Sequence, residues 1–323
     1  MTHQKEVMIN ENHIIISLLF LSIGFSQKEY NNNNLVEMDN GFWTLKFSKE
    51  PISGKVYGLF GEVKPYKKVY MGNLRKGKRE GKWVFYYQST GKKKYEYYFK
   101  DGKQNGLFTK WSKSGKKVFT KTLKDGKKHG LYIEWWPNGK SKSYEGTFKD
   151  EKQDGLFTKW YENGQKKEEG TYKNEKIDGL NTEWHENGQK SKETTYKNVK
   201  KDGVQTQWYE NGQKKFEWTY RDGKIIGLWT EWWSNGHVKE EGIYKDGIKK
   251  DVWTSRNENG QKLSDKIYNN GFEIERTEWS YYENGKKKFE ENYKDGKKDG
   301  LMTIWWPNGQ LYSEEIWKDG NPL

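Results

Sequence analysis

The sequence predicts an all-β protein, an elongated single-layer antiparallel β-meander of about ten 24-residue hairpin repeats. Three observations lead to this fold class. A turn ending in Gly returns every 24 or 25 residues, alternating β-forming residues precede each turn, and Lys, Glu and Gln fill most remaining positions. Because a lone hairpin is marginal in water and cannot bury its apolar side, we expect neighbouring copies to stabilise one another.

The repeat is counted on the glycine that ends each turn. Trp recurs four residues before this glycine, Thr six before it, and an aromatic residue eight after it. A period kept from residue 91 to residue 309 indicates a structural unit. The glycines are Gly91, Gly115, Gly139, Gly164, Gly188, Gly212, Gly236, Gly260, Gly285 and Gly309.

Each unit reads as two strands joined at the Asn-Gly turn. In one copy, the pattern Leu-x-Thr-x-Trp at 156–160 predicts the first strand, and 165–173 the second. A two-residue turn would pair Trp160 with Lys167, whereas a three-residue loop ending in a Gly bulge places Trp160 and Tyr172 on one face. We favour the second arrangement, because a thin sheet gains most when its rings gather on one side.

Ahead of the array the chain divides into three segments. Residues 1–26 contain an apolar run, 14–25, followed by small residues, which predicts a secretory signal peptide. Residues 27–40 are interpreted as a linker, 41–80 as a divergent first repeat and cap, and 81–323 as the repeat array. The apolar run is too short to span a bilayer, so we expect a protein that is secreted or periplasmic, or on the outer surface of a bacterium, and not membrane-spanning.

Composition limits the function classes. Hydrophobic residues make up only 32% of the chain and charged residues 33%, yet there are 17 Trp, 22 Tyr and 14 Phe, so we expect a folded, thin sheet. Cysteine is absent, which excludes disulfides and thiolate chemistry. The net charge is +13, but Lys alternates with Glu and Asp, which makes nucleic acid an unlikely partner.

Two segments show a family resemblance. DGLFTKWYENGQKKEEGTYKNEK (154–176) and DGLMTIWWPNGQLYSEEIWKDGN (299–321) resemble the bacterial variant of the MORN (membrane occupation and recognition nexus) repeat. The resemblance extends over roughly 72–323 and implies a single-layer β-meander without enzymatic activity in the repeats. Relatives are described as lipid- or protein-binding scaffolds, and the bacterial variant is sometimes labelled an antitoxin component.

No constellation of residues predicts catalysis, a metal site or a cofactor. His129, His185 and His237 have no partner at ligand or triad spacing, and His185 occupies a slot that holds an aromatic residue in other copies. A carboxylate recurs five residues after the turn glycine in most copies. Equivalent carboxylates favour repeated pairing with Lys across strands over an acid–base pair, which needs unlike environments.

The residue directly after the recurring Trp is often aromatic, and it forms the candidate binding surface. Such a ring could stack on sugars or hold a quaternary ammonium group, as in the choline- and glucan-binding hairpin repeats that this unit resembles in spacing. The alternative is cross-strand packing. The candidates are Trp136, Tyr161, Tyr209, Trp233 and Trp306.

These observations predict a non-enzymatic exported scaffold at the bacterial envelope. Its partner would be a protein or an envelope polymer, with glycans and anionic lipid head groups both possible, held by many weak contacts. Two alternatives stay open: a carbohydrate- or choline-type cell-wall-binding module, and a cytoplasmic antitoxin-like or immunity protein.

Overall fold

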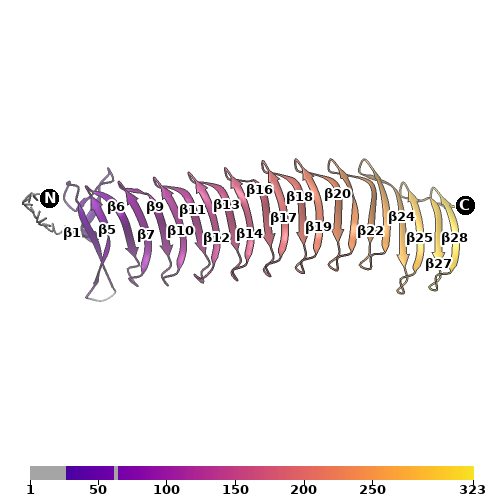
Figure 1. Ribbon diagram of the computed structural model, residues 1–323, viewed down its shortest axis with the longest axis horizontal. Coiled ribbons are helices and arrows are strands. Elements are labelled where there is room, and N and C mark those ends of the chain that lie inside the picture. The colour runs from indigo at the N-terminus through magenta and orange to yellow at the C-terminus, as the bar shows by residue number, and fades with distance from the viewer. Residues whose placement is uncertain (1–26, 62–64) are drawn as a thin grey trace, which may run out of the picture.

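The computed structural model describes residues 27–61 and 65–323 of the chain. It consists of one long open sheet, in which consecutive antiparallel hairpins follow one another from the N-terminal to the C-terminal end, and a small two-stranded sheet near the N-terminal end (Figure 1). These residues contain no α-helix, and they contain no helix that is long and apolar enough to cross a membrane. The predicted fold class is confirmed. The predicted signal peptide, 1–26, lies outside the described residues.

The strands of the array follow the period of the sequence. Where a hairpin strand is divided, its first two residues carry a separate label. The strands are β6 (Lys78–Tyr86), β7 (Lys93–Lys100), β8 (Lys103–Gln104), β9 (Gly106–Trp111), β10 (Lys117–Lys124), β11 (Lys127–Trp135), β12 (Lys142–Lys149), β13 (Lys152–Trp160), β14 (Lys166–Lys173), β15 (Lys176–Ile177), β16 (Gly179–Trp184), β17 (Lys190–Lys197), β18 (Lys200–Trp208), β19 (Lys214–Arg221), β20 (Lys224–Trp232), β21 (Val238–Lys245), β22 (Ile248–Arg256), β23 (Lys262–Asn269), β24 (Phe272–Tyr281), β25 (Lys287–Lys294), β26 (Lys297–Lys298), β27 (Gly300–Trp305), β28 (Leu311–Lys318) and β29 (Asn321–Pro322).

The N-terminal end is closed by a cap. The segment interpreted as a linker, 27–40, instead contributes strands and a buried Leu35 to it, because its apolar residues pack onto the first hairpin. Val56 and Trp83 lie in the same cluster, and the Arg79 guanidinium lies over the Trp83 ring at 5.2 Å. The elements of the cap are β1 (Glu29–Asn31), the 3-10 turn η1 (Asn32–Asn34), β2 (Leu35–Glu37), β3 (Trp43–Leu45), β4 (Gly54–Phe60) and β5 (Lys67–Arg75). Strand β1 pairs in parallel with β4, and β2 pairs with β3.

The turn within most hairpins is the predicted three-residue loop, whereas the hairpins that turn at 88–91 and 137–140 have four-residue loops. Between β13 and β14, the Tyr161 N–H donates to the Gln165 carbonyl at 2.9 Å, and the Gly164 N–H donates to the Tyr161 carbonyl at 3.0 Å. Gly164 has φ 89°, a conformation that glycine adopts without a Cβ penalty. The loop length is therefore confirmed.

The expectation that Trp160 and Tyr172 share a face is wrong. Lys159 pairs with Glu168 but Trp160 pairs with Lys166, so Lys167 is an extra, bulged residue. One inserted residue reverses the alternation of the whole following strand. The Tyr172 ring consequently packs on Phe157, with 4.9 Å between ring centroids, on the face opposite Trp160.

The sheet therefore has two distinct faces. We call the face that carries Phe157 and Tyr172 the ring face; its rings contact one another from hairpin to hairpin, as Tyr97 and Phe108 do at 4.3 Å. We call the face that carries Trp160 the threonine face, after the Thr six residues before seven of the ten turn glycines. Buried threonines of this row are Thr109, Thr182, Thr206, Thr230, Thr254 and Thr303.

Two-residue reversals join successive hairpins at the other long edge. Both central residues have positive φ, as in Asp101 at 50° and Gly102 at 82°, which suits the twist of the flanking strands. Glu175 and Val199 occupy the usual glycine position and still adopt φ of 64° and 73°. The backbone of the array thus overrides the preference of these side chains.

Candidate binding surface

The candidate aromatic residues lie in a row where each hairpin meets the next. The Tyr161 hydroxyl donates to the Trp184 carbonyl at 2.8 Å, and the Tyr209 hydroxyl to the Trp232 carbonyl at the same distance. The indole N–H of Trp136 and that of Trp233 make the equivalent bonds to the Trp160 and Arg256 carbonyls, at 3.2 and 3.0 Å. Each ring thus links its repeat to the following one.

His185 and Trp306 complete this row. The His185 Nε2 lies 3.1 Å from the Trp208 carbonyl, so the imidazole fills the structural slot of the missing aromatic residue. Trp306 is 49% exposed and packs edge-to-face on Tyr312, with 4.5 Å between ring centroids. Trp306 therefore offers more open ring surface than the four residues whose polar tips contact the next repeat.

In most copies the recurring carboxylate has its lysine on the same strand, whereas we expected it across strands; Glu96 has both, Lys93 on its own strand and Lys82 on the neighbouring one. Lys166 Nζ lies 2.6 Å from the Glu169 carboxylate and 5.5 Å from the Trp184 ring centroid of the next repeat. The Thr158 hydroxyl, on the neighbouring strand, donates to Glu169 at 3.3 Å. Lysines that bridge a carboxylate and the next Trp in this way also include Lys93, Lys190, Lys214, Lys262 and Lys287.

These contacts shift the acid strength of the carboxylates. Burial alone would raise the pKa of Glu96 and that of Glu290. Hydrogen bonds outweigh the effect of burial, so that both pKa values lie below the ordinary range. Glu96 accepts from Lys82 and Lys93, and Glu290 accepts from Lys287 and Trp279. The same kind of neighbour thus keeps both carboxylates ionised, which explains them structurally. An acid–base pair would need two carboxylates in unlike environments.

A row of exposed aliphatic side chains runs along the threonine face. We call it the stripe: it consists of the aliphatic residues eight before eight of the ten turn glycines, and its members are 42 to 61% exposed. A row of exposed apolar side chains is a candidate contact surface. The members are Leu107, Leu131, Leu156, Leu180, Val204, Leu228, Val252 and Leu301.

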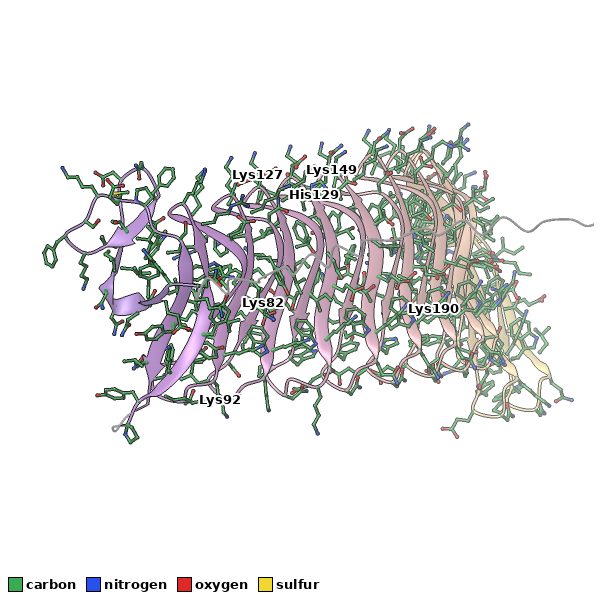
Figure 2. All side chains as sticks on the ribbon, turned by 60° about the vertical axis from the view of Figure 1, so that its left-hand side comes forward. Lys82, Lys92, Lys127, His129, Lys149 and Lys190 are labelled. Atoms are coloured by element: carbon green, nitrogen blue, oxygen red, sulfur yellow. The ribbon has the colours of Figure 1, made fainter. Side chains whose placement is uncertain are left out.

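A border of basic residues follows the stripe along the reversal edge. In most reversals two basic residues lie directly opposite each other on the two strands, as do Lys124 and Lys127, Lys149 and Lys152, and Lys173 and Lys176. By strand alternation from Thr171, the cross-strand partner of Leu156, Lys173 lies on the threonine face. Figure 2 shows Lys127 and Lys149 at one long edge of the sheet, and Lys92 at the opposite edge.

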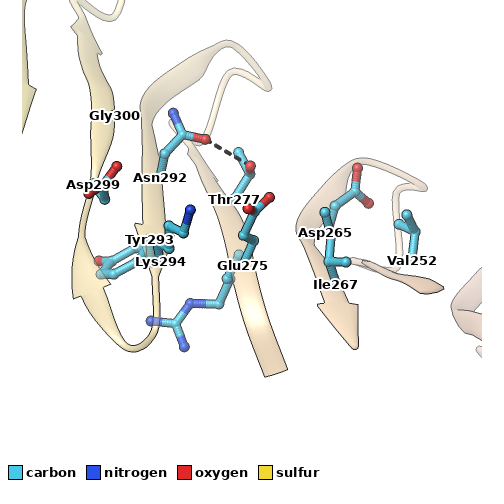
Figure 3. Close-up of a pocket in the computed structure, with 11 residues that line it drawn as sticks. Val252, Asp265, Ile267, Glu275, Thr277, Asn292, Tyr293, Lys294, Asp299 and Gly300 are labelled. Atoms are coloured by element: carbon cyan, nitrogen blue, oxygen red, sulfur yellow. Dashed lines mark hydrogen bonds between the residues drawn. The ribbon is translucent and has the colours of Figure 1, made fainter. Parts of the chain in front are cut away.

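The stripe is interrupted in one repeat by a polar hollow of about 480 Å³. Thr277 occupies the stripe position there, and its hydroxyl donates to the Asn292 side chain at 2.8 Å (Figure 3). The Asn292 amide N–H₂ in turn donates to the Leu301 carbonyl at 2.7 Å. Asp265 and Glu275 also line the hollow. The Thr277 hydroxyl and the Asn292 amide of the hollow are therefore already hydrogen-bonded. The hollow separates Leu301 from the rest of the stripe.

The stripe and its border were not among the predicted site residues. Their signal is present in the sequence as an aliphatic residue eight before, and a basic residue nine after, most of the turn glycines. The expected face assignment concealed it, because Leu156 was placed on the same face as the Tyr172 ring. No group of three or more metal-ligating side chains is found among the residues that the structure describes.

These features define a class of protein. The chain is a quasi-one-dimensional array of β-hairpin repeats, in which each unit contacts chiefly its two neighbours and the exposed surface is periodic.

The chain belongs to the MORN repeat variant family. The family model matches residues 128–150, 153–174, 177–198, 201–222, 226–246, 278–295 and 298–319. This confirms the resemblance seen in the sequence, and it supports a repeat-based binding scaffold.

Other comparisons add no functional information. No curated protein matches the sequence. A solved structure titled "Crystal Structure of TcdB2-TccC3-Cdc42" aligns with 80% of this chain at 10% identity and a TM-score of 0.18, and one titled "Crystal Structure of TcdB2-TccC3-TEV" with 88% at 12% and 0.19. The aligned regions are 16% and 18% of those chains. Scores this low carry no argument about fold or function.

Proposed function

We propose that this protein is a non-enzymatic, exported scaffold that holds a partner at the bacterial envelope through its threonine face. One observation supports the binding surface: the stripe leaves aliphatic side chains exposed in eight repeats, whereas the rings of the opposite face pack on one another. A periodic surface binds by many weak contacts whose sum gives affinity without a deep pocket.

Export is proposed from the sequence. The apolar run of residues 14–25 and the small residues after it have the form of a signal peptide. Expression of the full chain with a C-terminal tag, followed by fractionation and N-terminal sequencing, tests it. Cleavage near Ser26 with the product outside the cytosol supports export, and an intact N-terminus on cytosolic protein contradicts it.

Binding through the stripe is tested by affinity capture from envelope extracts. The test variant combines Leu156→Ser, Leu180→Ser and Leu228→Ser, which removes the apolar surface without touching buried side chains. The control combines Val36→Ser, Leu263→Ser and Leu311→Ser, which are exposed aliphatic residues outside the stripe. We expect the captured protein or polymer to be lost from the first variant and kept by the second. Equal capture by both would exclude the stripe.

A further inference from the structure

The stripe is richest in apolar side chains between Leu180 and Val252. Ile243 is the direct cross-strand partner of Leu228 and is 43% exposed, so it widens the stripe there. At the neighbouring reversal Ile248 replaces the usual border lysine and is 48% exposed. We call this part the central section.

Val199 adds an unusual feature to the same section. It is 48% exposed at the tip of a reversal, with φ 73°. A β-branched residue in the left-handed region is strained, and glycine or asparagine would fit better. The reversal thus presents an apolar side chain at its tip, beside the central section.

The border beside the central section is strongly basic. Lys197 lies opposite Lys200 and Arg221 opposite Lys224, all four exposed. Like charges directly opposite each other destabilise a sheet. Among the ion pairs formed by residues 27–61 and 65–323, none involves these four side chains. The nearby Asp202 carboxylate accepts the Asp222 backbone N–H, at 3.2 Å.

The charge of the border differs along the array. Reversal 197–202 holds three lysines and one aspartate, and reversal 245–250 the same numbers, so each has net charge +2. Reversal 149–154 holds two lysines and three carboxylates, and its net charge is −1. Reversal 124–129, outside the section, also has net charge +2, and reversal 221–226 inside it has +1. What distinguishes the central section is that its basic reversals lie beside the widened stripe. An acidic partner with an apolar face is therefore attracted to it, and a second copy of this basic chain is repelled.

The spacing of the stripe is close to the heptad repeat of a helix. One repeat advances by two strands, about 9.6 Å at ~4.8 Å per strand. A helix returns to the same side every seven residues, about 10.5 Å at ~1.5 Å per residue, whereas an extended strand does so every ~6.7 Å. A helix lying along the sheet therefore presents one apolar residue per repeat.

We propose that the central section binds an acidic amphipathic helix of a partner protein, whose apolar residues contact the stripe and whose carboxylates lie over the basic border. This inference rests on the proposed function and names the class of its partner.

The probe is a synthetic peptide of about 21 residues with Leu at heptad spacing and Glu beside it. A peptide of the same composition in scrambled order is its control. We expect the heptad peptide to bind the full chain in fluorescence anisotropy, more weakly at high salt, and the scrambled peptide to bind at least about tenfold more weakly. Equal binding of both peptides overturns the proposal.

Matched variants locate the site. Lys197→Glu, Lys200→Glu, Arg221→Glu and Lys224→Glu together should weaken peptide binding about tenfold or more. The same change at Lys149, Lys152, Lys173 and Lys176, which occupy equivalent slots outside the section, should leave it within about twofold. Val199→Gly should weaken binding while retaining the fold, as judged by circular dichroism. Equal loss in both charge variants overturns the location.

Two further probes separate this inference from the proposed function. Vesicles of phosphatidylcholine with phosphatidylserine, and a DNA duplex, are titrated in the same assay. If either binds through the central section while the heptad peptide does not, the helix proposal fails. If the peptide does not bind but the stripe variant still loses its captured partner from extracts, the scaffold function stands and the helix proposal fails.

Discussion

Trp253 shows how single residues organise the ring face. It is 1% exposed, lies 5.2 Å from the Trp229 ring and 5.0 Å from the Tyr244 ring, and has Lys249 Nζ 3.7 Å from its centroid. A Cβ added to Gly242 would come within 2.2 Å of the indole. The absence of a side chain at 242 thus makes room for the ring.

We expect Gly242→Ala to destabilise the array by about 1–3 kcal/mol, because the added methyl overpacks against the indole. Urea denaturation followed by Trp fluorescence measures the loss. Ile243→Ala, at the exposed neighbouring position, should cost less than about 1 kcal/mol. Equal stability of Gly242→Ala and the wild type would show that Trp253 can move aside.

The rings at the repeat boundary act through their polar tips. Tyr161→Phe removes only the hydroxyl that donates to the Trp184 carbonyl, so we expect a loss of about 1 kcal/mol. Hydrogen exchange at β13 and β16 reports the loss where it occurs. Tyr312→Phe, at a ring that is 57% exposed, is the control and should have no measurable effect.

At the scale of the hairpin, one bulged residue decides which side chains meet. Lys167 has no partner on β13, and its insertion puts Glu169 opposite Thr158 and Gly170 opposite Phe157. The small residue at 170 leaves space for the Phe157 ring, since an added Cβ would lie 2.9 Å from it. The bulge therefore determines which side chains lie on the ring face and which lie on the threonine face.

Deletion of Lys167 should remove the bulge and keep the register. With Glu168 directly after Lys166, Trp160 still pairs with Lys166 and Lys159 with Glu168, so the Tyr172 ring stays on the ring face. We expect exchange protection across β13 and β14 to be kept in the deletion variant. Insertion of one Ala after Lys167 should reduce it, because a second extra residue would move the rest of β14 by one position. Loss of protection in the deletion variant would contradict this role of the bulge.

The hydrogen bonds that Glu96 and Glu290 accept make their hairpins sensitive to acid. The folded pKa of Glu96 and that of Glu290 lie below their ordinary value of 4.5, so their contribution to stability is present above pH 4.5 and is lost as pH falls through the lowered pKa. Urea denaturation at pH 7 and pH 3.5 should show lower stability in acid. Glu290→Gln should reduce the difference, and an unchanged difference would remove Glu290 from the explanation.

At the scale of the molecule, every hairpin depends on its neighbours. The bonds from Tyr161 and Tyr209 span 23 residues, and the lysine–tryptophan contacts also join consecutive copies. Interactions of this range give a rod whose stability grows with the number of adjacent copies. A partner that spans several repeats would stabilise the same rod.

Small-angle X-ray scattering tests this shape. About 24 strand spacings give a rod on the order of 110 Å long, with a radius of gyration above ~30 Å. A compact domain of this length would have a radius of gyration of about 20 Å. A value near the second figure would contradict the extended array.

The sequence by itself determined the period, the strands, the three-residue turns and the family, because each depends on local residue types repeated at fixed spacing. Gly164 and its equivalents encode their own turns. It did not determine which residues share a face, since the bulge at Lys167 reverses the alternation and is visible only in the pairing of strands. The tertiary structure alone decided that Tyr161 bonds to the next repeat and that Leu156 is exposed, because both depend on how adjacent copies pack.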